Sequence, residues 1–474
     1  MSKPSSLDKV AGTGGEEVMV SLYEAHKKIY PRSVTGLFAK WRWFFVFATQ
    51  LFFYGIPWLQ WGGRQAMLFD LDTRRFYIFG LVLYPQDVIY LAAILIISAM
   101  LLFLFTAVAG RQWCGYACPQ TVYTEIYLWI ERKIEGDRSA RMRLDAAPMS
   151  ATKFSRKVAK QLVWMAVGLW TGFTFVGYFT PIRELAGHVM SWSLGPWETF
   201  WIFFYGFATS GNAGFMREQV CMYMCPYARF QSAMFDKDTL IVSYDTQRGE
   251  PRGARSKKAD PKALGLGDCV NCTLCVQVCP TGIDIRNGLQ YECISCAACI
   301  DVCDQVMDKV GLPRGLIRYS TENAMQHKLD HKSVLSHIIR PRILVYTAIL
   351  ILITLVAGYF LAHRIPLKVD VIRDRSVLTR EADDGSIENV FMLQIMNTSE
   401  EAQRYKITVD GLNGARIAGA SEVDADAAGL TSFNVVVAAP PDAGKRGSNP
   451  IHFTITSEQN PEITLREKAS FLLP

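Results

Sequence analysis

Cysteine dominates the chemistry that this 474-residue sequence can carry out. All twelve cysteines lie between Cys114 and Cys303, where they form two C-x3-C-P pairs and two four-cysteine runs with none left over. A secreted protein held together by disulfides would be short and would spread its cysteines over the whole fold. Clustered thiols in a long chain instead predict metal ligation in a reducing compartment.

The two four-cysteine runs have the spacing C-x2-C-x2-C-x3-C, in which the fourth cysteine of each run binds the other of two [4Fe–4S] clusters. We therefore predict one cluster on Cys269, Cys272, Cys275 and Cys303, and a second on Cys293, Cys296, Cys299 and Cys279. Zinc ribbons need cysteine pairs rather than triplets. Asp304 follows the second run where the first run has Pro280, and its carboxylate is expected to lower the potential of the nearby cluster.

The two C-x3-C-P pairs are a weaker signal. If Pro119 and Pro226 each begin a helix, Cys118 and Cys225 occupy N-cap positions. The helix dipole, together with arginines 111, 217 and 229, is then expected to lower the pKa values of these two N-cap thiols. Thiolates and thioethers together favour Cu(I). The predicted copper ligands are Cys114, Cys118, Cys221, Cys225, Met222 and Met224. The alternative is that the cysteines are apolar packing residues and the methionines face lipid.

Five segments have the length and apolarity of a bilayer span, which requires about 20 residues. They are Trp41–Trp61, Asp87–Ala109, Lys160–Thr180, Trp197–Ala213 and Arg342–Ala362. The composition agrees, because 50% of the residues are hydrophobic and only 20% are charged. These features predict a polytopic α-helical membrane protein with five spans.

Lysine and arginine set the predicted orientation. They are concentrated in the N-terminal segment, in 111–160 and in 214–341, whereas 62–86 balances arginine with aspartate and 181–196 has a single arginine. Basic loops stay on the cytoplasmic side, so the N-terminus and the clusters are predicted to be cytoplasmic and the C-terminus periplasmic. The basic residues lie beside apolar stretches and the net charge is only +6, so no nucleic-acid partner is expected.

The segment after Arg364 alternates apolar and polar residues between turns, which predicts strands. The expected strands are Val390–Asn397, Tyr405–Val409, Ser432–Val437, Ile451–Thr456 and Ile463–Leu473. About seven strands in roughly 110 residues predict an all-β immunoglobulin-like sandwich.

The predicted domains follow from these segments. They are an N-terminal segment 1–40, a four-helix membrane region 41–213, a cytoplasmic segment 214–341 with a ferredoxin-like insert at about 265–310, a fifth helix 342–362 and the sandwich 364–474.

Histidine is absent from all five predicted spans, so the sequence offers no histidine axial ligand for a haem within the bilayer. The redox chemistry is therefore predicted to stay on the cytoplasmic side. We interpret His327, His331 and His337, which precede the last span, as loop residues rather than metal ligands.

The chain resembles the FixG/RdxA/CcoG family, accessory factors of the cbb3-type cytochrome c oxidase. The resemblance extends over nearly the whole length and includes the lead-in Ile29–Arg32, both C-x3-C-P pairs, the double four-cysteine run and the β-rich tail. It implies a protein of the bacterial cytoplasmic membrane that reduces Cu(II) to Cu(I) for the oxidase. By that resemblance, the paired cysteines would bind copper and the eight remaining cysteines would carry the electron relay.

Two other functions remain open from the sequence. One is a quinol-linked electron-transfer subunit, similar to the NapH-type proteins that share four spans, paired C-x3-C-P motifs and ferredoxin clusters. The other is a non-enzymatic scaffold for oxidase assembly. The expected partners are membrane lipid, copper ions, assembly factors of the oxidase and an electron donor that the sequence does not name. A homodimer is also compatible with the sequence.

Overall fold

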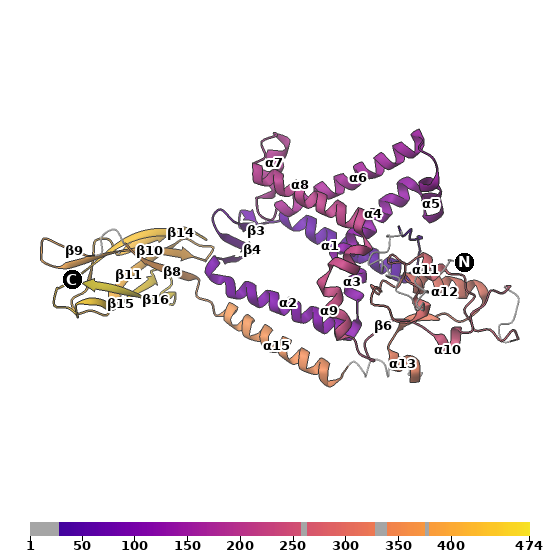
Figure 1. Cartoon of the computed structure of the whole chain (residues 1–474). Helices are drawn as coiled ribbons and strands as arrows, with labels where there is room; N and C mark the ends of the chain where they lie inside the picture. Colours follow the sequence, from indigo (N-terminus) through magenta and orange to yellow (C-terminus); the bar gives the residue numbers. More distant parts are fainter. Residues whose placement is uncertain (1–27, 257–262, 328–338, 375–378) are drawn as a thin grey trace, which may run out of the picture.

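The computed structural model describes residues 28–256, 263–327, 339–374 and 379–474. A β-sandwich lies at one end of the molecule, a unit that carries the four-cysteine runs lies at the other, and long helices connect them (Figure 1). His331 and His337 lie outside the described residues, whereas His327 ends the helix α13 (Glu322–His327).

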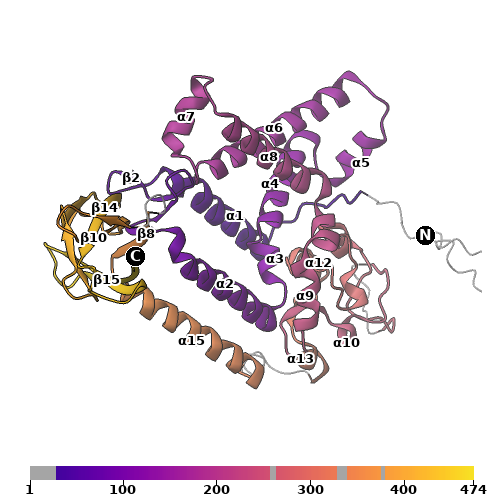
Figure 2. The same cartoon turned by 60° about the vertical axis from the view of Figure 1, so that its left-hand side comes forward.

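Two helices of the described chain are long and apolar enough to cross a membrane, by length and composition. They are α2 (Val88–Ala109), which the short helix η2 (Pro85–Asp87) precedes, and α15 (Pro341–Ala362). They pack side by side (Figure 2), and the hydroxyl of Tyr90 donates to the carbonyl of Phe360 at 3.3 Å. Most of their leucine and isoleucine side chains are exposed, as lipid-facing side chains would be.

The other three predicted spans are also helical, but with different limits, and they do not meet the same criterion. They are α1 (Leu37–Gly55), α6 (Ala151–Val176) and α8 (Pro196–Ser210). The predicted end of the first span at Trp61 is wrong, because the 3-10 turn η1 (Ile56–Trp58) contains Pro57 and leads into a hairpin of β1 (Gln60–Trp61) and β2 (Arg64–Gln65). The count of five spans therefore stays a prediction.

Helices α6 and α8 approach each other closely through small residues. A Cβ atom added to Gly168 would lie 2.6 Å from the carbonyl oxygen of Gly206, and one added to Gly172 would lie 2.2 Å from that of Ile202. Glycines four residues apart allow such close backbone contact between helices. The short helix α7 (Ile182–Met190) closes this hairpin.

The C-terminal sandwich has one sheet of five strands and one of four. The first sheet has the order β12-β14-β10-β8, with β9 also paired to β10, and the second has the order β13-β11-β15-β16. All five predicted strands are present, as β10 (Ile387–Asn397), β11 (Gln403–Asp410), β14 (Leu430–Ala439), β15 (Gly447–Ser457) and β16 (Thr464–Leu473). The others are β8 (Leu367–Arg373), β9 (Arg380–Glu381), β12 (Arg416–Ala418) and β13 (Glu422–Ala425).

A small sheet packs against this sandwich. It consists of β3 (Met67–Asp70), β4 (Arg75–Ile78) and β5 (Leu81–Leu83). The hydroxyl of Tyr84 donates to the carbonyls of Ala428 and Gly429, and Lys368 pairs with the buried Asp87. The loop between the first two predicted spans thus lies at the same end of the molecule as the C-terminal domain.

The cysteine-rich unit at the other end combines mostly short elements with the longer helices α4 and α12. Strands β6 (Ile241–Tyr244) and β7 (Ile317–Ser320) pair antiparallel beside α12 (Ala298–Val310). The remaining elements are α3 (Gln112–Tyr116), α4 (Pro119–Glu135), α5 (Arg138–Ala146), η3 (Gly211–Met216), η4 (Val220–Met224), α9 (Pro226–Met234), α10 (Thr246–Gly249), α11 (Leu274–Gln277) and η5 (Ile285–Asn287).

Candidate iron–sulfur and thiol site

Two cavities divide the eight run cysteines in the pattern that the spacing predicts. One cavity is lined by Cys269, Cys272, Cys275 and Cys303, and the other by Cys279, Cys293, Cys296 and Cys299 together with Cys275. The fourth cysteine of each run thus lies with the first three of the other run. The assignment of each cysteine to a cluster remains a prediction, and this placement supports it.

The two loops that carry the runs adopt the same unusual backbone. Asn271 and Thr273 flank Cys272, Ser295 and Ala297 flank Cys296, and all four have positive φ values between 52° and 58°. Residues other than glycine adopt this conformation at a cost and keep it where the surroundings require it. In both runs, the left-handed residues on either side of the second cysteine curve the loop around its cavity.

Burial determines the acid–base state of these thiols. It raises the pKa of Cys293 and of Cys303 to about 12, and it raises that of Cys275 to about 11. The thiolates of the same cavity add to the effect, since Cys275, Cys269 and Cys272 all raise the pKa of Cys303. A buried thiol group of this kind ionises when a cation compensates its charge. The donor set and its surroundings therefore fit iron–sulfur clusters.

Both C-x3-C-P pairs begin a helix as predicted. Cys118 is the N-cap of α4 and Cys225 is the N-cap of α9, with a proline at the first position of each helix. Electrostatic interactions link Cys221 to the other three thiols of the two pairs. The fold thus brings together two pairs that lie about a hundred residues apart in the sequence.

The predicted decrease of the N-cap thiol pKa is wrong for Cys118. Burial raises the pKa of Cys114 and Cys118, and it raises that of Cys221 to about 12. The backbone amides of Gln120 and Thr121 lower the pKa of Cys118, as a helix N-terminus should, but burial and Cys114 outweigh them. Of the three predicted arginines, Arg111 lowers the pKa of Cys114, whereas Arg217 pairs with Glu131 and Arg229 donates to a backbone carbonyl.

The first thiol pair lies directly against the second cluster loop. Cys114 is buried in one apolar cluster with Ile294 and Cys296. A Cβ atom added to Gly115 would lie 2.6 Å from the carbonyl oxygen of Ile294, so only glycine permits this approach. Sequence reasoning missed this contact, because a glycine between two cysteines gives no sign of what it touches.

The two cysteine pairs, as the structure describes them, do not form a binding site for a single metal ion. No three Cys, His, Asp or Glu side chains in the described part of the chain are arranged to hold one metal ion. Among the predicted thioether ligands, Met224 is 55% exposed and Met222 is half-buried. A metal bound here would therefore have to draw the two pairs closer together.

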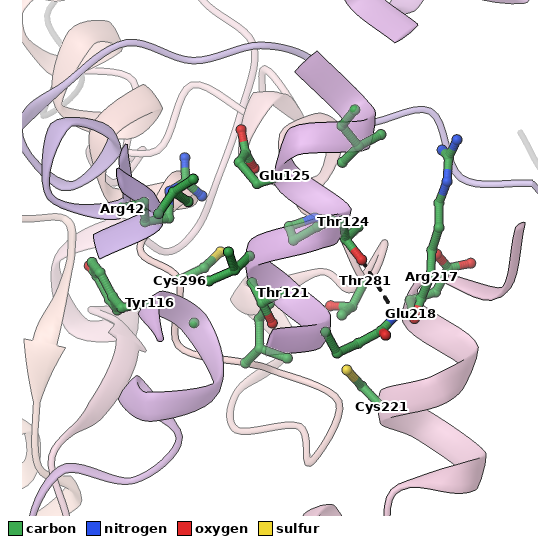
Figure 3. A pocket seen from close by; sticks show the side chains of 17 residues that line it. Arg42, Tyr116, Thr121, Thr124, Glu125, Arg217, Glu218, Cys221, Thr281 and Cys296 are labelled. Carbon is green, nitrogen blue, oxygen red and sulfur yellow. Dashed lines mark hydrogen bonds between the residues drawn. The ribbon is translucent and has the colours of Figure 1, made fainter. Parts of the chain in front are cut away.

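A cavity of about 40 Å³, with a mostly apolar lining and a few polar side chains, lies between the loop of the second cysteine run and the second thiol pair. Arg42, Glu125, Thr281, Cys221 and Cys296 all contribute to its wall (Figure 3). A space of this size between polar groups is sufficient for water. The sequence did carry a signal for Arg42, since an ionisable residue at the start of an apolar helix usually faces the protein interior.

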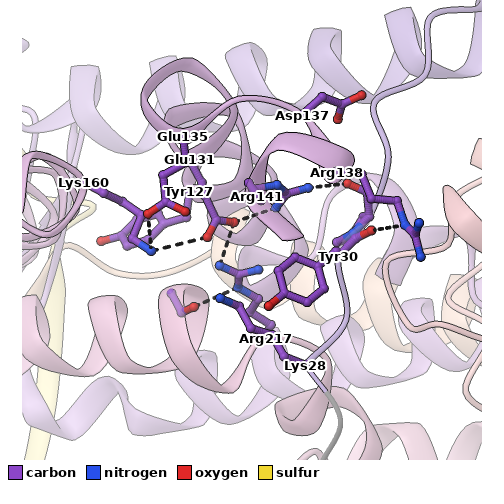
Figure 4. A network of polar contacts seen from close by, with 12 residues as sticks. Lys28, Tyr30, Tyr127, Glu131, Glu135, Asp137, Arg138, Arg141, Lys160 and Arg217 are labelled. Carbon is purple, nitrogen blue, oxygen red and sulfur yellow. Dashed lines mark hydrogen bonds and ion pairs between the residues drawn. The ribbon is translucent and has the colours of Figure 1, made fainter. Parts of the chain in front are cut away.

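A buried ion network holds the segment before the second pair in place (Figure 4). The carboxylate of Glu131 on α4 pairs with Arg141 at 2.7 Å, with Arg217 at 3.0 Å and with Lys160 at 3.4 Å. Burial alone would raise the pKa of Glu131, but these three cations hold it below its ordinary value. Arg217 also donates to the carbonyl of Gly214 at 2.8 Å, so the network fixes the chain just before Cys221.

Two carboxylates close to the clusters have structural roles. Asp301 on α12 accepts hydrogen bonds from the amides of Phe38 and Ala39 at 3.2 and 2.7 Å and thereby caps α1. Sequence reasoning missed this role, because the partners are more than 260 residues apart. Asp304 accepts from the amide of Gly315 at 2.9 Å, and its charge helps to raise the pKa of Cys303.

These features define the class: two four-thiol groups beside two further thiol pairs are typical of an iron–sulfur electron-transfer protein. Comparison with family models agrees. Residues 216–322 match a 4Fe-4S dicluster domain, residues 91–136 match a 4Fe-4S binding domain, and residues 357–474 match the IG-like fold at the C-terminal of FixG.

Curated relatives identify the family. The chain is 38% identical to the nitrogen fixation protein FixG of Rhizobium meliloti, over 85% of this chain and 83% of that protein. It is 40% identical to protein RdxB of Cereibacter sphaeroides, over 82% of this chain and 83% of that protein. It is 39% identical to protein RdxA of the same organism, over 86% of this chain and 89% of that protein. The chain therefore belongs to the FixG/RdxA family.

One solved structure is similar to part of the chain. It is the crystal structure of a FixG-related protein from Vibrio parahaemolyticus, with 26% identity and a TM-score of 0.21. The match covers 23% of this chain and 95% of that structure.

Proposed function

We propose that this protein is a cupric reductase of the bacterial cytoplasmic membrane that supplies Cu(I) for assembly of a cbb3-type oxidase. In this proposal, electrons enter the two [4Fe–4S] clusters and pass to Cu(II) held by Cys114, Cys118, Cys221 and Cys225. Each Cu(II) ion takes one electron from a reduced cluster and leaves as Cu(I). The acceptors of the product are assembly factors of the oxidase.

The observation that carries the proposal is the contact between the first thiol pair and the second cluster loop. Cys114 shares an apolar cluster with Cys296, and Gly115 leaves no side chain between the two backbones. A metal at the pairs would therefore lie next to a cluster ligand. Thiolate ligands also favour the reduced ion, because Cu(I) is the softer of the two copper states.

The proposal includes the five-span topology predicted from the apolar segments and the basic loops. The clusters and thiol pairs would lie on the cytoplasmic side, where the thiols stay reduced. The sandwich would lie in the periplasm, together with the loop of β3 to β5 that packs against it. Its position favours contact with an assembly partner outside the cytoplasm.

The test is the rate at which Cu(II) reoxidises dithionite-reduced protein. Serine at both Cys221 and Cys225 is expected to abolish copper binding and to slow reoxidation by at least about tenfold, with cluster absorbance unchanged. Met224→Leu is the matched control, because the exposed thioether is a weaker ligand than a thiolate, and it should have a smaller effect. Equal rates in the wild type and the double-serine variant would show that copper takes electrons directly from the clusters.

A second candidate function is electron transfer without copper chemistry. The match of residues 91–136 to a 4Fe-4S binding domain favours it, because that segment contains Cys114 and Cys118. The two pairs would then hold a third cluster. Two clusters correspond to about eight irons per chain and three to about twelve, so iron analysis of anaerobically purified protein distinguishes the two candidates.

A further inference from the structure

One arginine lies buried where the first thiol pair meets the second cysteine run. Arg111 follows the end of α2 and precedes Cys114 by three residues, and only 3% of its surface is exposed. Its guanidinium donates to the carbonyl of Tyr291, which lies two residues before Cys293. This side chain therefore connects the segment of the first pair to the start of the second run.

The partners of Arg111 are a carbonyl and thiols. Among the described residues, no carboxylate forms an ion pair with Arg111, and its hydrogen bonds go to the carbonyl of Tyr291 and the thiol of Cys114. It also interacts electrostatically with Cys221 and Cys293. An unpaired charge in a protein interior is costly. Thiolate ligands give a [4Fe–4S] cluster a net negative charge, so a bound second cluster would compensate the charge of this arginine.

A second arginine near the same cysteine run has carboxylates around it. Arg42 and Cys296 line one cavity (Figure 3) and interact electrostatically. Glu125 and Asp301 also interact with Arg42, so its charge is partly compensated within the protein. Arg111 is therefore the better candidate for a positive charge that acts on the second cluster.

The first cavity has the opposite balance of charge. Asp304 directly follows Cys303 and interacts electrostatically with it. No ion pair of the described residues includes Asp304, and Arg314, which interacts with it, lies at the surface and pairs with another aspartate. Arg286 lines the cavity, but an ion pair with Asp284 at 2.6 Å neutralises its charge. The first cluster would therefore lie beside a negative charge.

We propose that Arg111 sets the direction of electron transfer, by holding the potential of the second cluster above that of the first. A positive charge favours the reduced form of a cluster, because reduction adds negative charge, and a carboxylate such as Asp304 disfavours it. Each transfer moves one electron and no proton, so that the first cluster is oxidised and the second is reduced. Electrons then collect beside Cys114. That the thiol pairs are the exit rests on the proposed function, whereas the order of the two potentials does not.

The experiment is a redox titration of the anaerobically purified holoprotein without copper, followed by electron paramagnetic resonance. Two different midpoint potentials are expected. Arg111→Gln should make reduction of the second cluster about tenfold less favourable, which lowers the higher midpoint by about 59 mV for one electron, and it should leave the lower midpoint unchanged. Arg111→Lys keeps the charge and should stay close to the wild type. Asp304→Asn should raise the lower midpoint alone.

The matched control is Arg340→Gln. The Arg340 guanidinium donates to the carbonyl of Ala107 near the same end of α2 at 2.7 Å, but it pairs with Asp236 at 2.9 Å. Because Asp236 compensates its charge and also pairs with a second arginine, both midpoints should keep their wild-type values in this variant.

The outcomes separate this proposal from the copper proposal, because the titration contains no copper. A selective fall of the higher midpoint in Arg111→Gln supports the proposal even if copper reduction fails. Unchanged midpoints, an equal shift of both midpoints, or the same shift in Arg111→Lys as in Arg111→Gln overturn it. If Arg111→Gln does not retain its clusters, Arg111→Met replaces it, and the same readings apply.

Discussion

The position of Cys303 allows a direct test of which cysteines bind which cluster. It follows the three second-run cysteines in the sequence, yet it lines the cavity of Cys269, Cys272 and Cys275. Cys303→Ser is therefore expected to damage the cluster of the first run and to leave the other cluster in place. Electron paramagnetic resonance of the reduced protein, together with iron content, provides the measurement.

The matched variant is Cys279→Ser, which should damage the cluster on Cys293, Cys296 and Cys299 instead. Cys279 is a suitable control because its sulfur lies 3.2 Å from the hydroxyl of Thr281 and faces the second cavity. If each serine damages the cluster of its own run, the crossover is incorrect.

The residues of the site differ in how readily a sequence reveals them. Thiols at fixed spacing form a local pattern, so the two cysteine runs and both N-caps could be recognised directly. The pKa values of the thiols could not be predicted from the sequence. The desolvation that raises them comes from packing partners, such as Ile294 and Val302 around Cys114. The contact of Gly115 with Ile294 and the capping of α1 by Asp301 also became evident only in three dimensions, because the partners are far apart in the sequence.

At the scale of elements, α1 depends on a residue of the cluster unit. Asp301 caps its first turn, and a Cβ atom at Gly36 would lie 2.3 Å from the carboxylate carbon of Asp301. Asp301→Ala is expected to destabilise the protein by about 1–2 kcal/mol, the upper part of the range for a lost N-cap. It should also loosen α1 from α12. Thermal unfolding in detergent and hydrogen exchange of the first turn of α1 provide the measurements.

Asp308→Ala on the same helix is the control for this prediction. Its carboxylate pairs with Arg314 at 2.7 Å on the surface, and exposed ion pairs contribute little to stability. It should leave α1 unchanged. A destabilisation as large as that of Asp301→Ala would indicate a general effect on α12 rather than the loss of the cap.

Several of the elements that sequence reasoning missed are short, although β8 has seven residues and α12 has thirteen. The five predicted strands are long enough to show alternation, whereas β12 has three residues and β13 has four. The first span was predicted too long, because the apolar residues continue to Trp61 although Pro57 ends the helical geometry. The start of helix α6 was predicted too late, because its first nine residues include Lys153, Arg156 and Lys157 and were not read as part of an apolar span.

At the scale of the whole molecule, the fold divides into two ends. The small sheet of β3 to β5 and the sandwich form one end, joined by the contacts of Tyr84 and Asp87. The cluster unit, the thiol pairs and the start of α1 form the other end. Helices α2 and α15 run between the two ends (Figure 2). This division agrees with the distribution of lysine and arginine, because the basic segments 111–160 and 214–341 belong to the cluster end.

A topology experiment tests whether the two ends lie on opposite sides of a membrane. Alkaline phosphatase folds only where disulfides form, so it is expected to be active when fused after Pro474 and inactive when fused near Gly265. A reporter that works in the cytoplasm should give the reverse pattern at the same two positions. The physical reason is the cost of moving the basic loops across the bilayer. Activity of the phosphatase at Gly265 would place the thiols in an oxidising compartment, where the cysteine pairs would form disulfides rather than hold Cu(I).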